Sequence, residues 1–365
     1  MALKANGSLL IKNCKGILQI REVYPTFLKG IDLSVLPSLE NGYILIKNGL
    51  VDSFGVMSDL PEVKIDEEID ATDRYVLPAF VDSHTHLVFA TSRESEFVDK
   101  IKGLSYSEIA EKGGGILNSA EKLRKTSEKE LIESATLRLQ EAMSTGTGAV
   151  EIKSGYGLDT ASEIKMLRVI KSLSENSPVT IKATFLGAHA FPKSKSRESY
   201  IREIKEEMIP EIARQNLAEY IDVFCEKGFF SIDESEDILN TGIKYGLKPK
   251  IHANQLTNNG GVQLGVKIKA LSVDHLESIA DQEILELGNS EVIPTLLPGA
   301  AFFLRMPYPP ARKMIDSGLG VAIASDFNPG SSPTSNMQLM ISLACIGMKM
   351  TPTEALNAST VNSSH

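Results

Sequence analysis

Cysteine is scarce in this 365-residue chain. The three that occur, Cys14, Cys225 and Cys345, lie far apart, and none belongs to a Cys-x-x-Cys pair. Their number and spacing exclude a disulfide framework of the kind that staples small secreted domains. We therefore expect reduced thiols that are mostly buried.

Long hydrophobic runs and an excess of basic residues are also missing. The first apolar stretch, Leu9-Leu10-Ile11, is too short for a signal peptide or a membrane-spanning helix. The formal net charge is -9 and the pI is about 5.4, which leaves no basic surface for a phosphate backbone. We expect a soluble, cytoplasmic protein that binds neither nucleic acid nor a membrane.

Two of the six histidines stand at the end of an apolar run. Residues 75–86 are largely apolar and end in His84-Thr85-His86. Side chains alternate along an extended strand, so both imidazoles face the same way and can share one metal ion. A lone pair of strand histidines is more often a core or surface pair. The positions of the other histidines decide between these interpretations.

Strand-like runs recur along the rest of the chain, separated by stretches with helical periodicity. Eight runs cover residues 80–86, 148–154, 180–189, 220–226, 249–254, 271–276, 291–297 and 320–326. This alternation predicts an α/β fold, a parallel (β/α)8 TIM barrel over residues 75–365. Short β-branched runs predict a small β-sheet domain over residues 1–74. A doubly wound open sheet is the alternative, but it would not bring eight strand ends to one pocket.

Polar side chains occupy the ends of these runs. They are His84, His86, Lys153, His189, Glu226, His252, His275 and Asp326. Active sites of such barrels are built where the strands end. Three imidazoles (His84, His86, His252) and the Asp326 carboxylate suit one zinc or ferrous ion with a position left for water. The metal would lower the pKa of that water from about 15.7 toward about 7, which gives a hydroxide nucleophile.

Further roles follow for the residues around this cation. Asp326 can take the proton of the water, His275 can polarise the oxygen under attack, and His189 would donate to the substrate. Each position also has a structural interpretation: an Asx turn for Asp326, a pair with Asp274 for His275, and a helix entry for His252. Their joint position at strand ends favours the functional interpretation.

Lys153 needs separate treatment, because a strand-end lysine in such barrels can be carboxylated to bridge two metals. We instead expect an ion pair with Glu151, which lies on the same face of the strand. This predicts a single-metal site. The triplet Gly113-Gly114-Gly115 lacks the Lys-Ser/Thr of a P-loop and is expected to form a hinge or lid segment.

Six motifs resemble the amidohydrolase superfamily and, within it, the imidazolonepropionase family. The resemblance runs from about residue 75 to the C-terminus, and the EIKSGYG and DFNP blocks are specific to the family. The motifs are FVDSHTHLVFA at 80–90, EIKSGYGLD at 151–159, FLGAHA at 185–190, DVFCE at 222–226, DHLE at 274–277 and SDFNPG at 325–330.

This resemblance implies hydrolysis of the ring amide bond of 4-imidazolone-5-propanoate to N-formimino-L-glutamate, in histidine degradation. Arg93 would clamp the propanoate carboxylate in a bidentate pair. A homodimer is the expected assembly. The implied metal ligands are His84, His86, His252 and Asp326. The implied substrate-binding residues are Arg93, Tyr156, His189, Gln255, Asn328, Gly330 and Ser331.

The chain departs from the family pattern at three places. Ser331 stands where threonine is usual. Asn254-Gln255 stands where many relatives have an acidic residue, which leaves open the group that assists His275. Residues 351–354, Thr-Pro-Thr-Glu, predict a helix start with a capping box. The sequence then ends at His365, whereas relatives continue with segments that complete the small sheet, so we expect a shortened chain with exposed strand edges.

Two other functions stay open on the sequence. The first is a deaminase or hydrolase of another small cyclic amide or amidine, such as a nucleobase. Arg93 argues against it, because a nucleobase has no carboxylate. The second is a barrel that has lost catalysis and serves as a scaffold. The intact metal-ligand positions and His275 argue against that.

Overall fold

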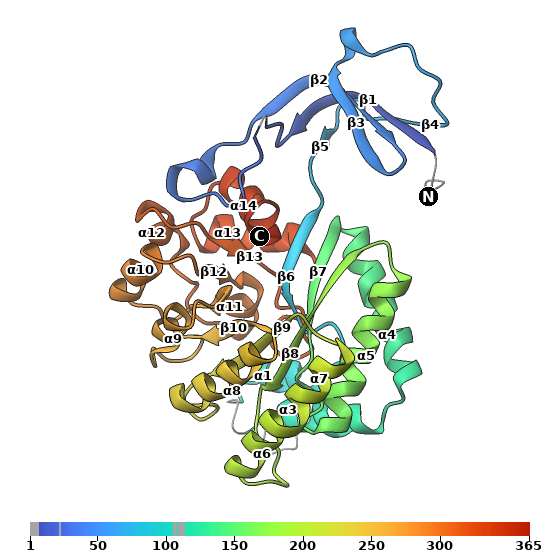
Figure 1. The fold of residues 1–365 in the computed structure, drawn as a ribbon. Helices are drawn as coiled ribbons and strands as arrows, with labels where there is room; N and C mark the ends of the chain where they lie inside the picture. The colour runs from blue at the N-terminus through green and yellow to red at the C-terminus, as the bar shows by residue number, and fades with distance from the viewer. Residues whose placement is uncertain (1–6, 22, 105–107, 109–113) are drawn as a thin grey trace. The chain divides into compact units, whose positions relative to one another are not determined.

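The structure, a computed structural model, describes residues 7–21, 23–104, 108 and 114–365. The chain divides into two compact units (Figure 1). One contains the described part of Met1–Thr26 with Ser34–Ala79, and the other contains Phe27–Leu33 with the described part of Phe80–His365. The sequence analysis places the boundary after residue 74 instead. Gly113 of the glycine triplet lies outside the described residues.

The smaller unit is a five-stranded sheet with the order β3-β2-β1-β4, in which β5 also pairs with β1. Strand β2 is antiparallel to β1 and β3, whereas β4 and β5 are parallel to β1. Leu10, Tyr43 and Leu45 form one core cluster of this unit. The bounds are β1 Ser8–Leu18, β2 Ser38–Lys47, β3 Leu50–Val56, η2 Met57–Asp59, β4 Glu67–Asp70 and β5 Tyr75–Val76.

The larger unit confirms the predicted barrel. Eight parallel strands follow one another in chain order from β6 to β13. Each coincides, within a few residues, with one of the eight predicted runs. The strands are β6 Phe80–Thr85, β7 Thr147–Lys153, β8 Thr180–Ala188, β9 Tyr220–Cys225, β10 Lys248–Ala253, β11 Ser272–His275, β12 Ile293–Leu296 and β13 Ala322–Ile323.

The barrel closes between its first and last strands. A parallel bridge joins Thr85, the last residue of β6, to Phe327, which follows β13. The amide of His86 donates to the carbonyl of Phe327 at 2.8 Å, and the amide of Asp326 donates to the carbonyl of His84 at 3.0 Å. These bonds satisfy backbone groups that would otherwise form two sheet edges.

Helix starts follow local capping chemistry. Ser127 caps α4 and forms a capping box with Glu130, which fixes the start of this helix at Glu128. The predicted capping box before α14 is confirmed, because the Glu354 amide donates to Thr351 Oγ1 at 3.3 Å and the Thr351 amide donates to Glu354 Oε2 at 2.7 Å.

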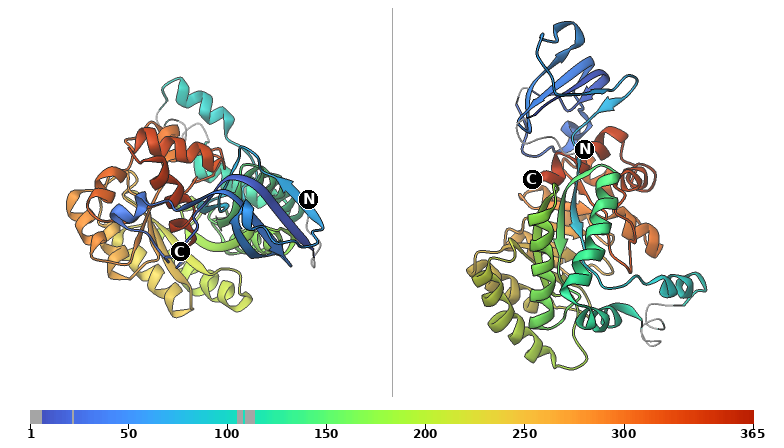
Figure 2. Two further views of the ribbon diagram at one scale, coloured as in Figure 1. Left: turned by 90° about the horizontal axis from the view of Figure 1, so that it is seen from above. Right: turned by 90° about the vertical axis from the view of Figure 1, so that its right-hand side faces the viewer.

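Helices surround the strands of the larger unit, with α4 packed along α5 (Figure 2). No described helix is long and apolar enough to cross a membrane. The helices are η1 Gly30–Ser34, α1 Glu94–Ile101, α3 Gly115–Lys125, α4 Glu128–Ser144, α5 Thr160–Asn176, α6 Arg197–Glu203, η3 Ile204–Met208, α7 Ile209–Gln215, α8 Ile232–Lys244, α9 Gly261–Lys267, α10 Asp281–Gly288, α11 Pro298–Leu304, α12 Ala311–Asp316, α13 Met337–Gly347, α14 Pro352–Ser359 and η4 Asn362–Ser364.

Asn362 joins three segments of the larger unit. Its buried side chain accepts from the Leu28 amide at 2.8 Å and donates to the carbonyls of Leu28 and Val321 at 3.0 and 2.9 Å. The segment Phe27–Leu33 is thereby tied to η4 and to the residue before β13. Backbone groups that cannot reach water are satisfied by one amide side chain.

We expect Asn362→Ala to lower the free energy of unfolding by about 2–4 kcal/mol, because it leaves buried donors and acceptors without partners. Urea denaturation measures this difference. Asn289→Ala removes an exposed amide that bonds only a helix carbonyl, and should change stability by less than about 0.5 kcal/mol. Equal effects of the two substitutions would contradict the role of Asn362.

Candidate active site

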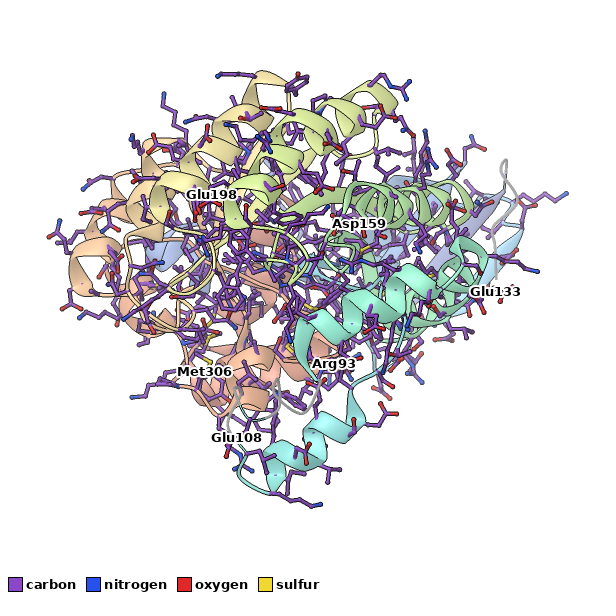
Figure 3. All side chains as sticks on the ribbon, turned by 90° about the horizontal axis from the view of Figure 1, so that it is seen from below. Arg93, Glu108, Glu133, Asp159, Glu198 and Met306 are labelled. Carbon is purple, nitrogen blue, oxygen red and sulfur yellow. The ribbon has the colours of Figure 1, made fainter. Side chains whose placement is uncertain are left out.

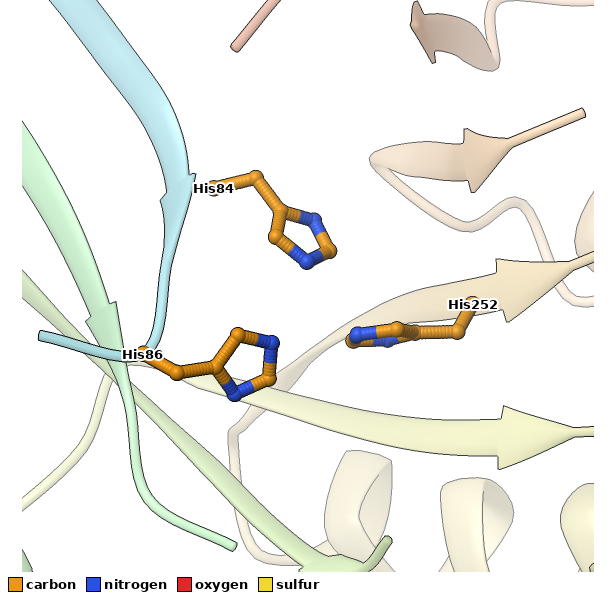
Figure 4. Close-up of side chains that lie close together, drawn as sticks. All are labelled: His84, His86 and His252. Carbon is orange, nitrogen blue, oxygen red and sulfur yellow. The ribbon is translucent and has the colours of Figure 1, made fainter. Parts of the chain in front are cut away.

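Three imidazoles meet inside the larger unit. His84 lies on β6, His86 follows that strand, and His252 lies on β10. One ring nitrogen of each lies within 4.8 Å of a ring nitrogen of the other two. Figure 4 shows the three rings converging. The alternation of side chains along β6 places His84 and His86 on the same face, as the pattern predicts.

The carboxylate of Asp326 completes this group. Asp326 Oδ1 lies 3.5 Å from the Nε2 atoms of both His84 and His86. His84, His275 and Asp326 form a second, overlapping set with ligand atoms within 4.8 Å. Burial raises the pKa of Asp326, so a neighbouring cation would favour its ionised form.

The donor atoms of the cluster fit a metal. His84 Nε2 and His252 Nε2 are buried and have no hydrogen-bond partner among the described residues. A buried nitrogen without a partner is costly, and a cation would satisfy both. Burial, with the charge of Lys153, lowers the pKa of His84 well below its usual value, so the ring is neutral and can ligate. Three nitrogens and one carboxylate oxygen are ligands that zinc and other divalent metals accept.

Two carboxylates lie behind the imidazoles. Asp274 Oδ2 is 2.6 Å from His84 Nδ1, and Asp222 Oδ2 is 2.9 Å from His252 Nδ1. At His84 the hydrogen-bonded carboxylate holds the proton on Nδ1 and turns the Nε2 lone pair toward the cluster, and at His252 Asp222 places a negative charge beside Nδ1. The pairing of Asp274 with its neighbour His275, considered from the sequence, is therefore wrong.

Lys153 connects these two carboxylates. Its Nζ lies 2.9 Å from Asp222 Oδ2 and 3.7 Å from Asp274 Oδ2. It also donates to Glu151 at 2.6 Å, which is the ion pair expected from the sequence. Burial alone would lower the pKa of Lys153, but the three carboxylates outweigh burial and raise it. Lys250 pairs with Glu151 from the other side. The lysines thus neutralise most of the charge beneath the cluster.

The cluster opens into a cavity of about 420 Å³, within the range of small-molecule sites. Arg93 and Met306, both of which line it, are labelled on one face of the molecule in Figure 3. All the substrate-binding residues implied by the resemblance line this cavity, as do the two proposed catalytic residues. They are Arg93, Tyr156, His189, Gln255, Asn328, Gly330 and Ser331, with His275 and Asp326.

Arg93 is held in place before any ligand arrives. Its Nε donates to Glu96 Oε2 at 2.8 Å, and its Nη2 also contacts that oxygen. The other oxygen of Glu96 accepts from the Gly115 amide at 2.9 Å. A Cβ on Gly330 would lie 2.2 Å from Arg93 Nη1. Glycine at position 330 therefore leaves the space that the guanidinium occupies.

The turn after Asp326 is organised by Asn328. Its Oδ1 accepts from the amides of Gly330 and Ser331 at 2.8 Å each, and its Nδ2 donates to Ser331 Oγ at 2.7 Å. Ser331 Oγ in turn donates to Asp326 Oδ2 at 3.2 Å. The Asx chemistry belongs to Asn328, so it does not explain the aspartate at 326.

His189 and Tyr156 form an aromatic wall. The His189 ring stacks on His86 with 5.2 Å between centroids and lies 5.6 Å from the Tyr156 ring. His189 Nδ1 is 3.0 Å from the Gly155 carbonyl. Gly155 has a φ of 111°, and a Cβ there would lie 2.9 Å from His189 Nδ1. Glycine is therefore required beside this histidine.

Asn254 and Gln255, although adjacent in the chain, have different surroundings in the structure. Asn254 Nδ2 donates to both oxygens of Glu283 at 2.9 and 3.0 Å, whereas Gln255 lines the cavity. Glu226, noted at a strand end, accepts from the Leu256 amide at 2.9 Å and so supports this loop. The acidic group nearest His275 is Glu277, with Oε1 at 3.4 Å from Nδ1.

His275 sits in a strained backbone conformation. Its φ is 87° and that of the next residue, Leu276, is 71°. Positive φ is costly for residues with a Cβ and occurs preferentially at functional sites. Burial lowers the pKa of His275, but Glu277 and the other neighbouring carboxylates outweigh burial and raise it above its usual value.

Several residues that line the cavity could not be identified as functional from the sequence. Lys100 lies on α1. Whether its side chain reaches the cavity depends on the orientation of that helix, which the sequence does not reveal. The remaining residues are apolar and indistinguishable from core positions in the sequence: Ile116, Phe224, Phe229, Leu256, Leu304 and Met306. Asp222 lies in a quoted motif, but its role depends on the neighbouring strand.

Comparison with solved structures agrees with this description of the fold. The chain resembles a triazine hydrolase variant (TM-score 0.69, 14% identity, 98% of this chain and 82% of that one). It also resembles a zinc-bound adenosine deaminase from Xanthomonas campestris (0.66, 14%, 98% and 79%) and a guanine deaminase from C. acetobutylicum with bound guanine (0.67, 16%, 98% and 86%). At these identities the comparisons show the fold, a barrel of parallel strands surrounded by helices, in agreement with the strand order from β6 to β13.

Comparison with sequence relatives shows the family of the chain. No family model matches the chain. It is 54% identical over 358 residues to the imidazolonepropionase of Flavobacterium johnsoniae, covering 98% of this chain and 87% of the relative. It is 51% identical over 360 residues to that of Christiangramia forsetii (98% and 88%) and 43% identical over 335 residues to that of Bacillus cereus (91% and 79%). The chain belongs to the imidazolonepropionase family, which confirms the resemblance found in the sequence.

We expect Lys153→Met to weaken zinc binding about 10- to 100-fold, because Asp222 and Asp274 lose the charge that orients them toward the ligand imidazoles. Competition with a chromophoric chelator measures the affinity. Lys182→Met on the adjacent strand β8 removes an exposed lysine that pairs with Glu219 and should leave zinc affinity unchanged. A folded Lys153→Met protein with wild-type affinity would contradict this role.

Proposed function

We propose that the protein hydrolyses the ring amide C–N bond of 4-imidazolone-5-propanoate to N-formimino-L-glutamate. Family membership supports this substrate. The observation that carries the proposal is that one cavity holds both the histidine and aspartate cluster and the guanidinium of Arg93. The cluster suits hydrolysis of an amide, and the guanidinium suits a carboxylate on the same small molecule.

His84, His86, His252 and Asp326 would hold one divalent cation, zinc or iron. Such a cation acts as a Lewis acid and lowers the pKa of water from about 15.7 toward about 7. Lys153 supports a single ion, because its ammonium already pairs with Asp222 and Asp274 and so does not serve as a carboxylated bridge between two metals.

The chain's own residues complete the reaction. Asp326 accepts a proton from the water that adds to the ring carbonyl carbon. His275 donates a hydrogen bond to the carbonyl oxygen, and Glu277, 3.4 Å from its Nδ1, keeps the ring oriented. The C–N bond then breaks, and the departing ring nitrogen takes up the proton held by Asp326. The buried cluster excludes bulk water from these steps.

Substrate orientation falls to the rest of the cavity. Arg93, fixed by Glu96, binds the propanoate carboxylate. Tyr156 and His189 offer hydrogen bonds and aromatic faces to the planar ring. Gln255, Asn328, Gly330 and Ser331 line the remaining wall. Ser331 keeps a hydroxyl where threonine is usual, and that hydroxyl donates to Asp326.

A nucleobase deaminase is the competing proposal, and two of the structural neighbours are deaminases. Identities of 14–16% carry only the fold to this chain. Arg93 separates the two proposals, because a nucleobase has no carboxylate to bind the guanidinium that lines the cavity. The observations therefore favour a substrate that bears a carboxylate.

We expect the zinc- or iron-loaded protein to consume 4-imidazolone-5-propanoate, followed as loss of ring absorbance, with N-formimino-L-glutamate as the product. His84→Ala should abolish turnover, because it removes one of the four side chains that would hold the cation. Guanine, adenine and cytosine serve as comparison substrates. Turnover of a base without turnover of the imidazolone would reverse the order of the two proposals, and stoichiometric metal with no turnover would favour the scaffold.

A further inference from the structure

Lys100 is a second cation in the wall of the cavity. It lies near the end of α1, and its Nζ donates to the Gly330 carbonyl at 2.7 Å. Gly330 is also the residue against which the Arg93 guanidinium packs. Both positive side chains therefore reach the same glycine, and both line the cavity that contains the imidazole cluster.

The charges around this glycine do not balance. Glu96 pairs with Arg93 through one oxygen and accepts the Gly115 amide with the other. Lys100 has no carboxylate within 4.0 Å among the residues that the structure describes. An ammonium has three donors, and among the described residues the Gly330 carbonyl is the hydrogen-bond acceptor of Lys100. Within the described part of the chain, Glu96 is the acidic partner that these two cations share, which leaves one positive charge uncompensated there.

This arrangement is unfavourable without a ligand. Burial, together with repulsion from Arg93, lowers the pKa of Lys100 to about 8. The ammonium lies over the Phe303 ring, with Nζ 4.9 Å from the ring centroid, and this contact helps to direct the side chain. At neutral pH the ammonium is still mostly charged. An anion bound between the two cations would offset both the burial and the repulsion.

We propose that Lys100 is a specificity-determining residue that binds the carboxylate of the substrate together with Arg93. Arg93 is already neutralised by Glu96, so Lys100 supplies the charge that distinguishes a carboxylate from a neutral group of the same shape. The inference rests on the proposed function for the identity of the substrate, and it adds a residue that the sequence motifs do not include.

The structural alternative is that Lys100 only ties α1 to the turn at Gly330. That role would depend on the hydrogen bond to the carbonyl and would not depend on the charge of the ligand. A pair of compounds separates the two roles: 4-imidazolone-5-propanoate, and its propanamide analogue, which has the same ring and chain length without the charge.

Lys100→Met keeps the length and apolar stem of the side chain and removes the charge. We expect it to raise KM for the propanoate about 10- to 100-fold, the usual loss for a hydrogen bond to a charged group, with kcat changed less than about threefold. The propanamide should be handled equally by the wild type and the variant. Lys100→Arg should restore most of the discrimination between the two compounds.

Lys102→Met is the matched control, because Lys102 is exposed one residue beyond α1 and does not line the cavity. It should leave both KM values unchanged. Circular dichroism checks the folding of each variant, and Lys100→Gln replaces the methionine variant if that one fails to fold. An unchanged KM for the propanoate, or an equal loss with the propanamide, would overturn the proposal.

Calorimetric titration measures the role of the Lys100 charge in binding, whether or not the protein turns over the imidazolone. If the wild type turned over neither compound, the proposed function would fail. Titration of the propanoate and the propanamide into the zinc-loaded wild type and Lys100→Met proteins would still test the charge assignment. Tighter binding of the propanoate, lost in the variant, supports it, and equal binding of the two compounds contradicts it.

Discussion

The hydrogen bond from the Asp326 amide to the His84 carbonyl, at 3.0 Å, closes the barrel and assembles the site at once. It fixes the last strand beside the first, and so brings a carboxylate from residue 326 within 3.5 Å of the imidazoles at 84 and 86. Asp82 strengthens this seam by accepting from Ser325 N at 2.9 Å and from its hydroxyl. An open sheet would leave these side chains on opposite edges.

Electrostatics explains why the buried cluster suits one divalent ion. Beneath the imidazoles, the carboxylates of Glu151, Asp222 and Asp274 face the ammonium groups of Lys153 and Lys250. Three negative charges against two positive charges leave one negative charge, and Asp326 adds a second. One divalent cation balances both in a region with little water. The lysines also fix the carboxylates that orient the imidazoles, so ligand geometry and charge balance come from the same contacts.

Much of this arrangement could be predicted from the sequence, because strand ends in a barrel converge whatever the loops do. The alternation of apolar runs with helical stretches placed His84, His252 and Asp326 at one end of one sheet. The partner of a side chain on another strand is not encoded in local periodicity. The sequence therefore offers His275 as a structural partner of Asp274, whereas Asp274 pairs with His84 across the barrel. Lys100 was missed for a similar reason, since its direction depends on the path of α1.

The central claim is that side chains from the first, fifth and eighth strands bind one cation at the mouth of the barrel. A crystal structure of the zinc-loaded protein, with anomalous data on both sides of the zinc edge, tests it most directly. The account predicts one peak per chain, with zinc about 2.0–2.2 Å from the ring nitrogens of His84, His86 and His252 and from Asp326. A peak elsewhere, or two peaks bridged by a modified Lys153, would contradict it.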